Sequence, residues 1–328
     1  MQKFRWGVIG TGTMAKVACR AIAKSGRHEI VAVYSRTYSR ADKFAKKYGA
    51  KCYTSLTEML ADERVDAVYI ATPHSVHYDN MIACIEAGKP VLTEKAFTVN
   101  AAQAKSVFDL AESKKVFVCE AMWTRFQPVV LEVADTVGRG EIGAVKRFTG
   151  GFSTPATWVK SFLSDRLFKP EYAGGALLDV GVYPVSFSQM LLGTPKEIKC
   201  SAKIADGIDY SDEITLVYDG AVCDLTCTFE GLRSFKGVIE GEKGKIVISN
   251  YTRPKKAVIY GENGEKKRTI RGKRGYVYEF DALADSVRRG ELKSRFVSPS
   301  DTVEVMKTLD ECRRQTGLVY PEKVEKTR

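Results

Sequence analysis

The stretch that decides the fold is Phe4-Arg5-Trp6-Gly7-Val8-Ile9-Gly10-Thr11-Gly12-Thr13-Met14-Ala15. Its apolar first half predicts a strand that leads directly into a glycine-rich turn and a helix reaching about Lys24. Two glycines followed three residues later by alanine match the dinucleotide-binding fingerprint. The turn lets the backbone approach a pyrophosphate, and the helix N-terminus offers N–H groups to it. We therefore expect a dinucleotide to contact Gly10, Thr11, Gly12, Thr13 and Met14; a purely structural turn is the alternative.

The residues that follow alternate between apolar strands and helices. Strands are predicted at 30–34, 67–71, 91–92 and 116–118, and helices at 40–48, 76–87 and 101–113. Unbroken apolar strands separated by helices indicate a parallel sheet covered on both faces. The sequence thus predicts an α/β protein whose residues 1–120 form a doubly wound Rossmann domain.

The pattern changes after residue 120. Helices are predicted at 128–137, 177–192, 277–288 and 300–315, and strands at 145–152, 214–218, 221–229, 236–240, 245–249 and 257–260. Closely spaced strands with short turns indicate an open, mostly antiparallel sheet. A chain of 328 residues also exceeds the usual size of a single core. We therefore expect residues 121–328 to form an α+β domain for substrate binding and oligomerisation.

The end of the second strand discriminates between the two nicotinamide dinucleotides. NAD-binding proteins place a carboxylate there to accept hydrogen bonds from the ribose. This chain has Ser35 and Arg36, with Arg40 just beyond. A hydroxyl and guanidinium groups suit a 2′-phosphate, which a carboxylate would repel. We expect NADP(H) bound through these residues; a solvated Arg36 is the alternative.

The formal charge of +11 raises the question of a polyanionic partner. Residues 253–295 hold 13 Lys and Arg against 6 Asp and Glu, a net charge of +7. A hairpin with a solvated basic strand explains this segment, and no nucleic-acid-binding motif accompanies it. An anion-attracting surface is the alternative, and we expect no nucleic-acid partner.

Membrane and metal partners are not expected either. The sequence has no run of eighteen apolar residues and no separate apolar leader segment before the first strand. The eight cysteines and three histidines are not spaced as metal ligands are, so we expect no metal site. Cysteines scattered in this way also predict a reduced, cytoplasmic protein.

Further motifs resemble the glucose–fructose oxidoreductase / inositol dehydrogenase (Gfo/Idh/MocA) family over nearly the whole chain. They are Ala71-Thr72-Pro73 with His77, Ala87-Gly88-Lys89-Pro90-Val91-Leu92-Thr93-Glu94-Lys95 and Gly174-Gly175-Ala176-Leu177-Leu178-Asp179-Val180-Gly181-Val182-Tyr183. Within the family, Glu120-Ala121-Met122-Trp123-Thr124-Arg125-Phe126 is similar to the branch of dimeric dihydrodiol dehydrogenases and NADP-dependent sugar dehydrogenases.

The resemblance implies a set of site residues. Lys95 would touch both substrate and nicotinamide, and Asp179 and Tyr183 would complete the catalytic set. Many members have histidine where this chain has Tyr183, and Glu-Lys-Pro is here Glu94-Lys95-Ala96. The cofactor would also contact Ala71, Thr72, Pro73, His74, His77 and Glu94.

The chemistry of these side chains agrees with that role. Asp179 and Tyr183 are four residues apart, so on a helix they share one face. Oxidising an alcohol needs a base for the hydroxyl proton, and a lysine ammonium near a tyrosine would lower the pKa of its phenol. The alternatives are a core aromatic for Tyr183, a surface cation for Lys95 and a purely structural carboxylate for Asp179.

Trp123, Arg125 and Phe126 follow the last Rossmann strand, at the edge where such sheets bind ligands. They are expected to line the substrate site; packing at the domain junction is the alternative. The sequence as a whole predicts an NADP(H)-dependent oxidoreductase acting on a sugar, polyol or trans-dihydrodiol, with Lys95 and Tyr183 handling the hydroxyl proton. A catalytically idle NADP(H)-binding redox sensor is the second hypothesis. A homodimer or higher oligomer is expected through the open face of the second sheet, using the segments 214–217 and 225–227.

Overall fold

The computed structural model describes residues 2–156, 165–232 and 234–327. The chain divides into two compact units. Unit 1 holds Met1–Ala121, Gly275–Thr302 and Glu325–Arg328, and unit 2 holds Met122–Arg274 and Val303–Val324. Residues 275–302, expected in the second domain, thus belong to the first. The cause is aromatic packing, because the Phe280 ring lies 5.0 Å from that of Trp6 and 5.1 Å from that of Tyr69.

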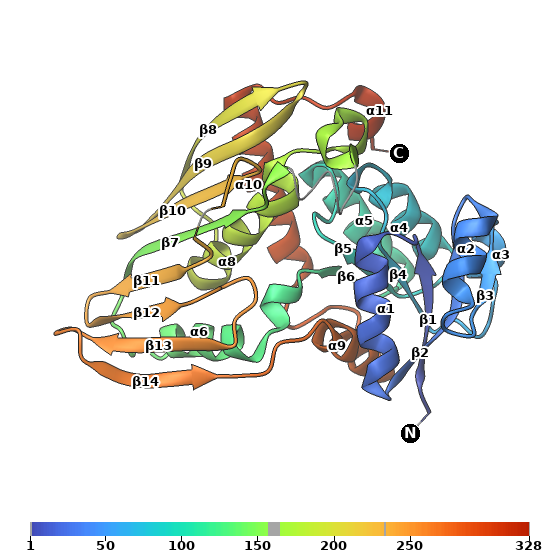
Figure 1. The fold of residues 1–328 in the computed structure, drawn as a ribbon, viewed down its shortest axis with the longest axis horizontal. Coiled ribbons are helices and arrows are strands. Elements are labelled where there is room, and N and C mark those ends of the chain that lie inside the picture. The colour runs from blue at the N-terminus through green and yellow to red at the C-terminus, as the bar shows by residue number, and fades with distance from the viewer. Residues whose placement is uncertain (1, 157–164, 233, 328) are drawn as a thin grey trace. The chain divides into compact units, whose positions relative to one another are not determined.

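Unit 1 contains a six-stranded sheet in the order β3-β2-β1-β4-β5-β6, in which every strand pair is parallel (Figure 1). Its strands are β1 (Phe4–Ile9), β2 (His28–Tyr34), β3 (Lys51–Tyr53), β4 (Ala67–Ile70), β5 (Val91–Glu94) and β6 (Val118–Ala121). The helices are α1 (Thr13–Ser25), α2 (Tyr38–Ala45), α3 (Leu56–Leu60), α4 (His77–Glu86), α5 (Ala101–Lys114) and α9 (Val277–Arg288). The predicted Rossmann sheet is confirmed. Only the short elements β3 and α3 were not anticipated, since three to five residues carry too little periodicity to be recognised.

Unit 2 contains an eight-stranded sheet in the order β14-β13-β12-β11-β7-β10-β9-β8. Its strands are β7 (Val145–Ser153), β8 (Glu197–Ala205), β9 (Ile208–Tyr218), β10 (Ala221–Thr228), β11 (Gly237–Gly241), β12 (Gly244–Ile248), β13 (Lys256–Gly261) and β14 (Lys266–Arg271). Only β7 and β10 pair in parallel. The mostly antiparallel sheet is therefore as predicted. The basic strand β14 exposes Lys266, Lys267 and Arg271, whereas Arg268 pairs with Glu132 and Glu141.

One face of this sheet is packed against α6 (Pro128–Gly138) and α8 (Val182–Leu192) (Figure 1). Ile214, Leu216, Leu225 and Cys227 point to that face and are at most 2% exposed. Helices of the same unit cover these four side chains, so an oligomer contact made by the segments 214–217 and 225–227 would use only their alternate residues. The opposite face carries the alternate residues Thr215, Val217 and Thr226, which are half-buried.

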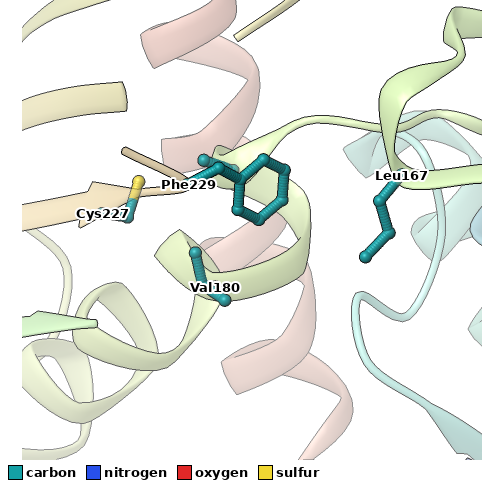
Figure 2. Packing of buried hydrophobic residues seen from close by; sticks show 5 residues of the cluster. Leu167, Val180, Cys227 and Phe229 are labelled. Atoms are coloured by element: carbon teal, nitrogen blue, oxygen red, sulfur yellow. The ribbon is translucent and has the colours of Figure 1, made fainter. Parts of the chain in front are cut away.

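The helix predicted at 177–192 begins with η5, a π-helical turn at Leu177–Gly181, and continues as α8. A buried cluster fixes η5 to the sheet: Val180 packs with Cys227, Phe229 and Leu167 (Figure 2). By length and composition the stretch Pro170–Leu192 could cross a membrane, but 78% of its apolar window is buried. That burial is typical of the core helix of a folded unit.

Candidate functional site

The glycine-rich turn of unit 1 has the form that a dinucleotide phosphate needs. Gly10 has a φ of 104°, and a Cβ there would lie 2.6 Å from the carbonyl oxygen of Ala71. Only glycine can therefore make this turn beside β4. Gly12 is the N-cap of α1 without a side-chain cap, and a Cβ added to it would meet nothing within 4 Å. The space beside Gly12 is thus open at the helix N-terminus, where backbone N–H groups favour a bound phosphate.

Two arginines stand beyond the end of β2. The Ser35 hydroxyl accepts a hydrogen bond from the Thr37 N–H at 3.3 Å, and Arg36 and Arg40 are exposed. The first turn of α2 holds no acidic residue. Among the described residues, no carboxylate pairs with either arginine in this structure, so both guanidinium groups can meet an anion from solution.

The loops that follow β4 and β5 are tied together by His77. Its buried ring has Nδ1 3.0 Å from the Ala96 carbonyl oxygen and Nε2 2.9 Å from that of Thr72. The ring of His74, also buried, lies 5.8 Å from it, edge to face. The His77 ring therefore bridges the backbone of the two loops and holds them together. Lys95 is half-buried at the start of the second loop, and the peptide between Lys95 and Ala96 is cis.

Buried carboxyl groups gather at the carboxyl end of β5. Glu94 accepts a short hydrogen bond from the Tyr69 hydroxyl. Glu279 of α9 is 1% exposed, and its Oε2 has no partner among the described residues. Burial, together with the negative charge of Glu94, raises the pKa of Glu279 well above its usual range. Sequence reasoning missed Glu279, because a lone glutamate in an amphipathic helix carries no signal of burial.

In unit 2, the structure brings two of the expected residues into direct contact. The indole Nε1 of Trp123 donates to the Tyr183 hydroxyl at 3.0 Å, and both side chains are buried. Trp123 belongs to η2 (Trp123–Phe126) and Tyr183 to α8. The Phe152 ring also packs on Tyr183, with ring centroids 5.1 Å apart. Tyr183 therefore has its hydroxyl oxygen fixed by a donor.

Arg125 and Phe126 are buried in the same short helix. The guanidinium of Arg125 donates from Nε to the Ser186 hydroxyl and from Nη2 to the Ser186 carbonyl, each at 2.9 Å. These bonds anchor η2 to α8 one turn beyond Tyr183. Ser186 was not anticipated, since a serine in an apolar helix has no distinctive pattern.

Asp179 lies on η5, which is held at its start by a second carboxylate. Oδ2 of the fully buried Asp209 accepts a short hydrogen bond from the Leu177 N–H. Gly175 makes room for it: φ is 114°, and a Cβ there would come within 2.0 Å of Asp209 Oδ1. Gly175 is thus explained by this carboxylate, which the sequence alone did not reveal, whereas a Cβ on Gly174 would lie 2.5 Å from the Leu167 carbonyl oxygen.

Asp209 in turn has an acidic neighbour, Asp212. Burial and the charge of Asp209 raise the pKa of Asp212 well above its usual range. Asp212 Oδ2 accepts from the Cys227 thiol at 3.2 Å, while Oδ1 of each aspartate has no other partner among the described residues. One proton held by Asp212 and donated to Asp209 satisfies both oxygens.

The expected catalytic set is divided between the units: Lys95 belongs to unit 1, and Asp179 and Tyr183 to unit 2. Within the described ranges, no group of three or more His, Cys, Asp and Glu side chains is arranged to hold a metal ion.

Comparison with known proteins agrees with both halves of the fold. Residues 4–122 match a family model described as "Oxidoreductase family, NAD-binding Rossmann fold". Residues 130–247 match the GFO/IDH/MocA C-terminal domain. The chain belongs to the Gfo/Idh/MocA oxidoreductase family. The resemblance seen in its motifs is thereby confirmed.

Individual relatives extend over nearly the whole chain. It is 34% identical to the D-xylose 1-dehydrogenase (NADP(+)) of Hypocrea jecorina, over 97% of this chain and 93% of that enzyme. It is 31% identical to the trans-1,2-dihydrobenzene-1,2-diol dehydrogenase of Mus musculus, over 97% and 98%. Among solved structures, a 3-ketoreductase from Actinomadura kijaniata in complex with NADP superposes with a TM-score of 0.83 at 25% identity, over 96% of this chain and 98% of that one.

Proposed function

We propose that the protein is an NADP(H)-dependent dehydrogenase or reductase that interconverts a carbinol and a carbonyl on a sugar, polyol or cyclic diol. The observation that carries the proposal is the buried Tyr183 hydroxyl, fixed by a donor at 3.0 Å and lying one helical turn after Asp179. A buried tyrosine hydroxyl needs some polar partner in any case; here the partner is a donor, which fixes the Tyr183 oxygen as an acceptor. The relatives that act on D-xylose and on a dihydrobenzenediol support this substrate class.

The cofactor is assigned to unit 1 on three features. The turn at Gly10 and Gly12 and the N-terminus of α1 hold the pyrophosphate. The Ser35 hydroxyl and the Arg36 and Arg40 guanidinium groups receive the 2′-phosphate, which distinguishes NADP(H) from NAD(H). His77 keeps together the loops after β4 and β5, which would contact the cofactor.

In the reaction the alcohol would become a carbonyl: NADP+, when bound, would take the hydride from the carbinol carbon, and one proton would be released from the hydroxyl. Tyr183 accepts that proton from the substrate hydroxyl. Lys95 stabilises the phenolate form of the tyrosine through its positive charge. Asp179 accepts a hydrogen bond from a second substrate hydroxyl and fixes the orientation of the substrate.

The substrate site is proposed to use Trp123 as an aromatic wall. The bonds of Arg125 to Ser186 hold this wall in place, since they fix η2 against α8. An aromatic side chain with one polar edge suits both a sugar ring and a cyclic diol.

The proposal also includes a homodimer through the uncovered face of the eight-stranded sheet. Val238, Val247 and Val258 stand side by side across β11, β12 and β13, on the face opposite α6 and α8. A row of β-branched side chains on a sheet face is suited to packing against a second copy.

A panel assay tests the function. Aldoses, polyols and trans-dihydrodiols are each supplied with NADP+ or NAD+, and absorbance at 340 nm reports the reduced cofactor. We expect turnover with at least one member of the panel, and with NADP+ in preference to NAD+. Tight NADPH binding with no turnover in either direction over the whole panel would contradict the proposal and favour a redox sensor.

A further inference from the structure

The hydrogen bond between Trp123 and Tyr183 assigns a role to the indole that goes beyond lining a pocket. The distance from Nε1 to the hydroxyl oxygen is 3.0 Å, and the two rings meet edge to face with centroids 6.4 Å apart. An indole N–H is a donor only, so the tyrosine oxygen must be the acceptor. The phenol proton of Tyr183 is therefore left for another partner.

The backbone around Trp123 is fixed on both sides. Gln127 Nε2 donates to the Trp123 carbonyl at 3.0 Å, and the Thr124 hydroxyl donates to the Thr252 carbonyl at 3.4 Å. The Arg253 guanidinium lies over the indole, 5.7 Å from the ring centroid. A cation over the ring draws electron density from it and makes the N–H a stronger donor. The indole is thus held and polarised toward the tyrosine.

Such a donor acts differently on the two protonation states of the phenol. A hydrogen bond to an ionised oxygen is roughly twice as strong as one to a neutral oxygen. The Trp123 N–H therefore favours the phenolate, which is the form that accepts a proton from an alcohol. In a buried site this preference is larger than it would be in water.

The other charged groups near Tyr183 in unit 2 differ in their effect. Asp179, on the preceding turn, opposes ionisation of the phenol. Arg125 on η2 and Arg253 beyond β12 favour ionisation, but Arg125 is bonded to Ser186 and Arg253 lies over the indole. Phe152 of β7 contributes only an apolar ring. The Trp123 indole, in contrast, donates directly to the hydroxyl oxygen.

We propose that Trp123 is a positioning residue for Tyr183: its indole N–H, donated to the hydroxyl oxygen, stabilises the phenolate form that accepts the substrate proton. This inference rests on the proposed function, in which Tyr183 is the acid–base group. No new covalent step is involved, because the proton still moves between the substrate hydroxyl and the Tyr183 oxygen.

The test is the pH dependence of kcat/KM for alcohol oxidation by the full chain with NADP+. Trp123→Phe removes the N–H and keeps an aromatic ring. We expect the pH at which activity rises to move upward by about one to two units, because losing a hydrogen bond to the charged phenolate raises the pKa of the phenol by about that much. Activity near neutral pH should fall about 10- to 100-fold and recover in alkaline buffer. The Kd for NADPH should be unchanged.

Two controls isolate the effect. Trp6 donates its indole N–H to His28 Nδ1 at 3.3 Å inside unit 1, so Trp6→Phe makes the same chemical change at a different buried site. It should lower Tm without moving the pH profile. If Trp123→Phe does not fold, Trp123→Leu provides a second apolar side chain without a donor at this position, and a folded form of either variant decides the question.

The outcomes separate the inference from the function on which it rests. If Tyr183→Phe abolishes the rise of kcat/KM with pH and Trp123→Phe shifts that rise, the proposed roles of Tyr183 and Trp123 are both supported. The role of Trp123 is overturned if Tyr183→Phe abolishes this rise but Trp123→Phe leaves it at the wild-type pH. It is also overturned if Trp123→Phe lowers activity equally at every pH. If Tyr183→Phe keeps the wild-type profile, the proposed role of Tyr183 fails, and the inference fails with it.

Discussion

Replacing Asp209 by alanine should reveal how η5 is held in place. The change removes the acceptor for the Leu177 N–H and leaves that donor buried without a partner. Asp212 loses its neighbour as well. We expect a loss of about 3 kcal/mol in the free energy of unfolding, because a charge-assisted hydrogen bond is lost and a buried N–H remains without an acceptor.

The assay is urea unfolding followed by far-UV circular dichroism. A matched control is Asp219→Ala, which removes an exposed aspartate paired with Lys196 and should change the free energy of unfolding by less than about 0.5 kcal/mol. Gly175→Ala should disturb the same hydrogen bond, because its Cβ would displace the Asp209 carboxylate. A loss below about 1 kcal/mol for Asp209→Ala would refute the assignment.

The shared proton makes the two aspartates unequal. Asp212→Asn supplies an N–H where Asp212 holds its proton, so it should be tolerated, whereas Asp209→Asn should not. The raised pKa of Asp212 means that its protonated form stabilises the fold at low pH, and that this contribution is lost as pH rises through that pKa. The asparagine variant at 212 should therefore lose less stability than wild type in alkaline buffer. Equal losses for both asparagine variants would argue against a proton held between them.

Three further predictions concern the cofactor, the buried glutamates and assembly. Arg36→Asp should weaken NADPH binding by about 1.5–3 kcal/mol, tenfold or more in Kd, and leave NADH binding nearly unchanged; an equal change in both constants would exclude Arg36 as the phosphate contact. Burial raises the pKa of Glu279, so its neutral form stabilises unit 1 at low pH and that contribution is lost as pH rises. Glu279→Gln should accordingly flatten the alkaline decline in Tm, and an unchanged decline would show that Glu279 is not its source. Val238→Glu should yield a monomer by light scattering if the sheet face binds a second copy; a wild-type protein that is itself monomeric at micromolar concentration would contradict the dimer.

Much of the fold is predictable from this sequence because its signals are local. The apolar strand before Gly10, the fingerprint and the alternating strands each specify their element within ten residues. The second sheet followed from short apolar segments separated by glycine and aspartate. The placement of α9 in unit 1 was not predictable, because it depends on the Phe280 ring packing against Trp6 and Tyr69, residues more than two hundred positions away in sequence.

The sequence identified the residues of the candidate site but not the contacts between them. Motifs pointed to Lys95, Asp179, Tyr183 and Trp123, but the bond from the indole to the phenol joins residues 60 positions apart. The buried acids Asp209, Asp212 and Glu279 gave no signal, since nothing in their neighbours distinguishes a buried carboxylate from a solvated one. Periodicity also separates the two faces of strands β9 and β10 without saying which one the helices cover, so the sequence could not tell which of their side chains remain available for an oligomer contact.

The central claim is that Tyr183 moves the substrate proton with the help of Lys95, and single-turnover kinetics of Tyr183→Phe, Lys95→Ala and the double variant test it most directly. With a substrate identified from the panel, Tyr183→Phe should lower the rate of NADPH formation by about 10²- to 10⁴-fold while the Kd for NADPH hardly changes. The double variant should be little slower than the slower single variant, since the two residues act as one unit. Near-normal turnover of a folded Tyr183→Phe enzyme, or strictly multiplicative losses in the double variant, would contradict this account.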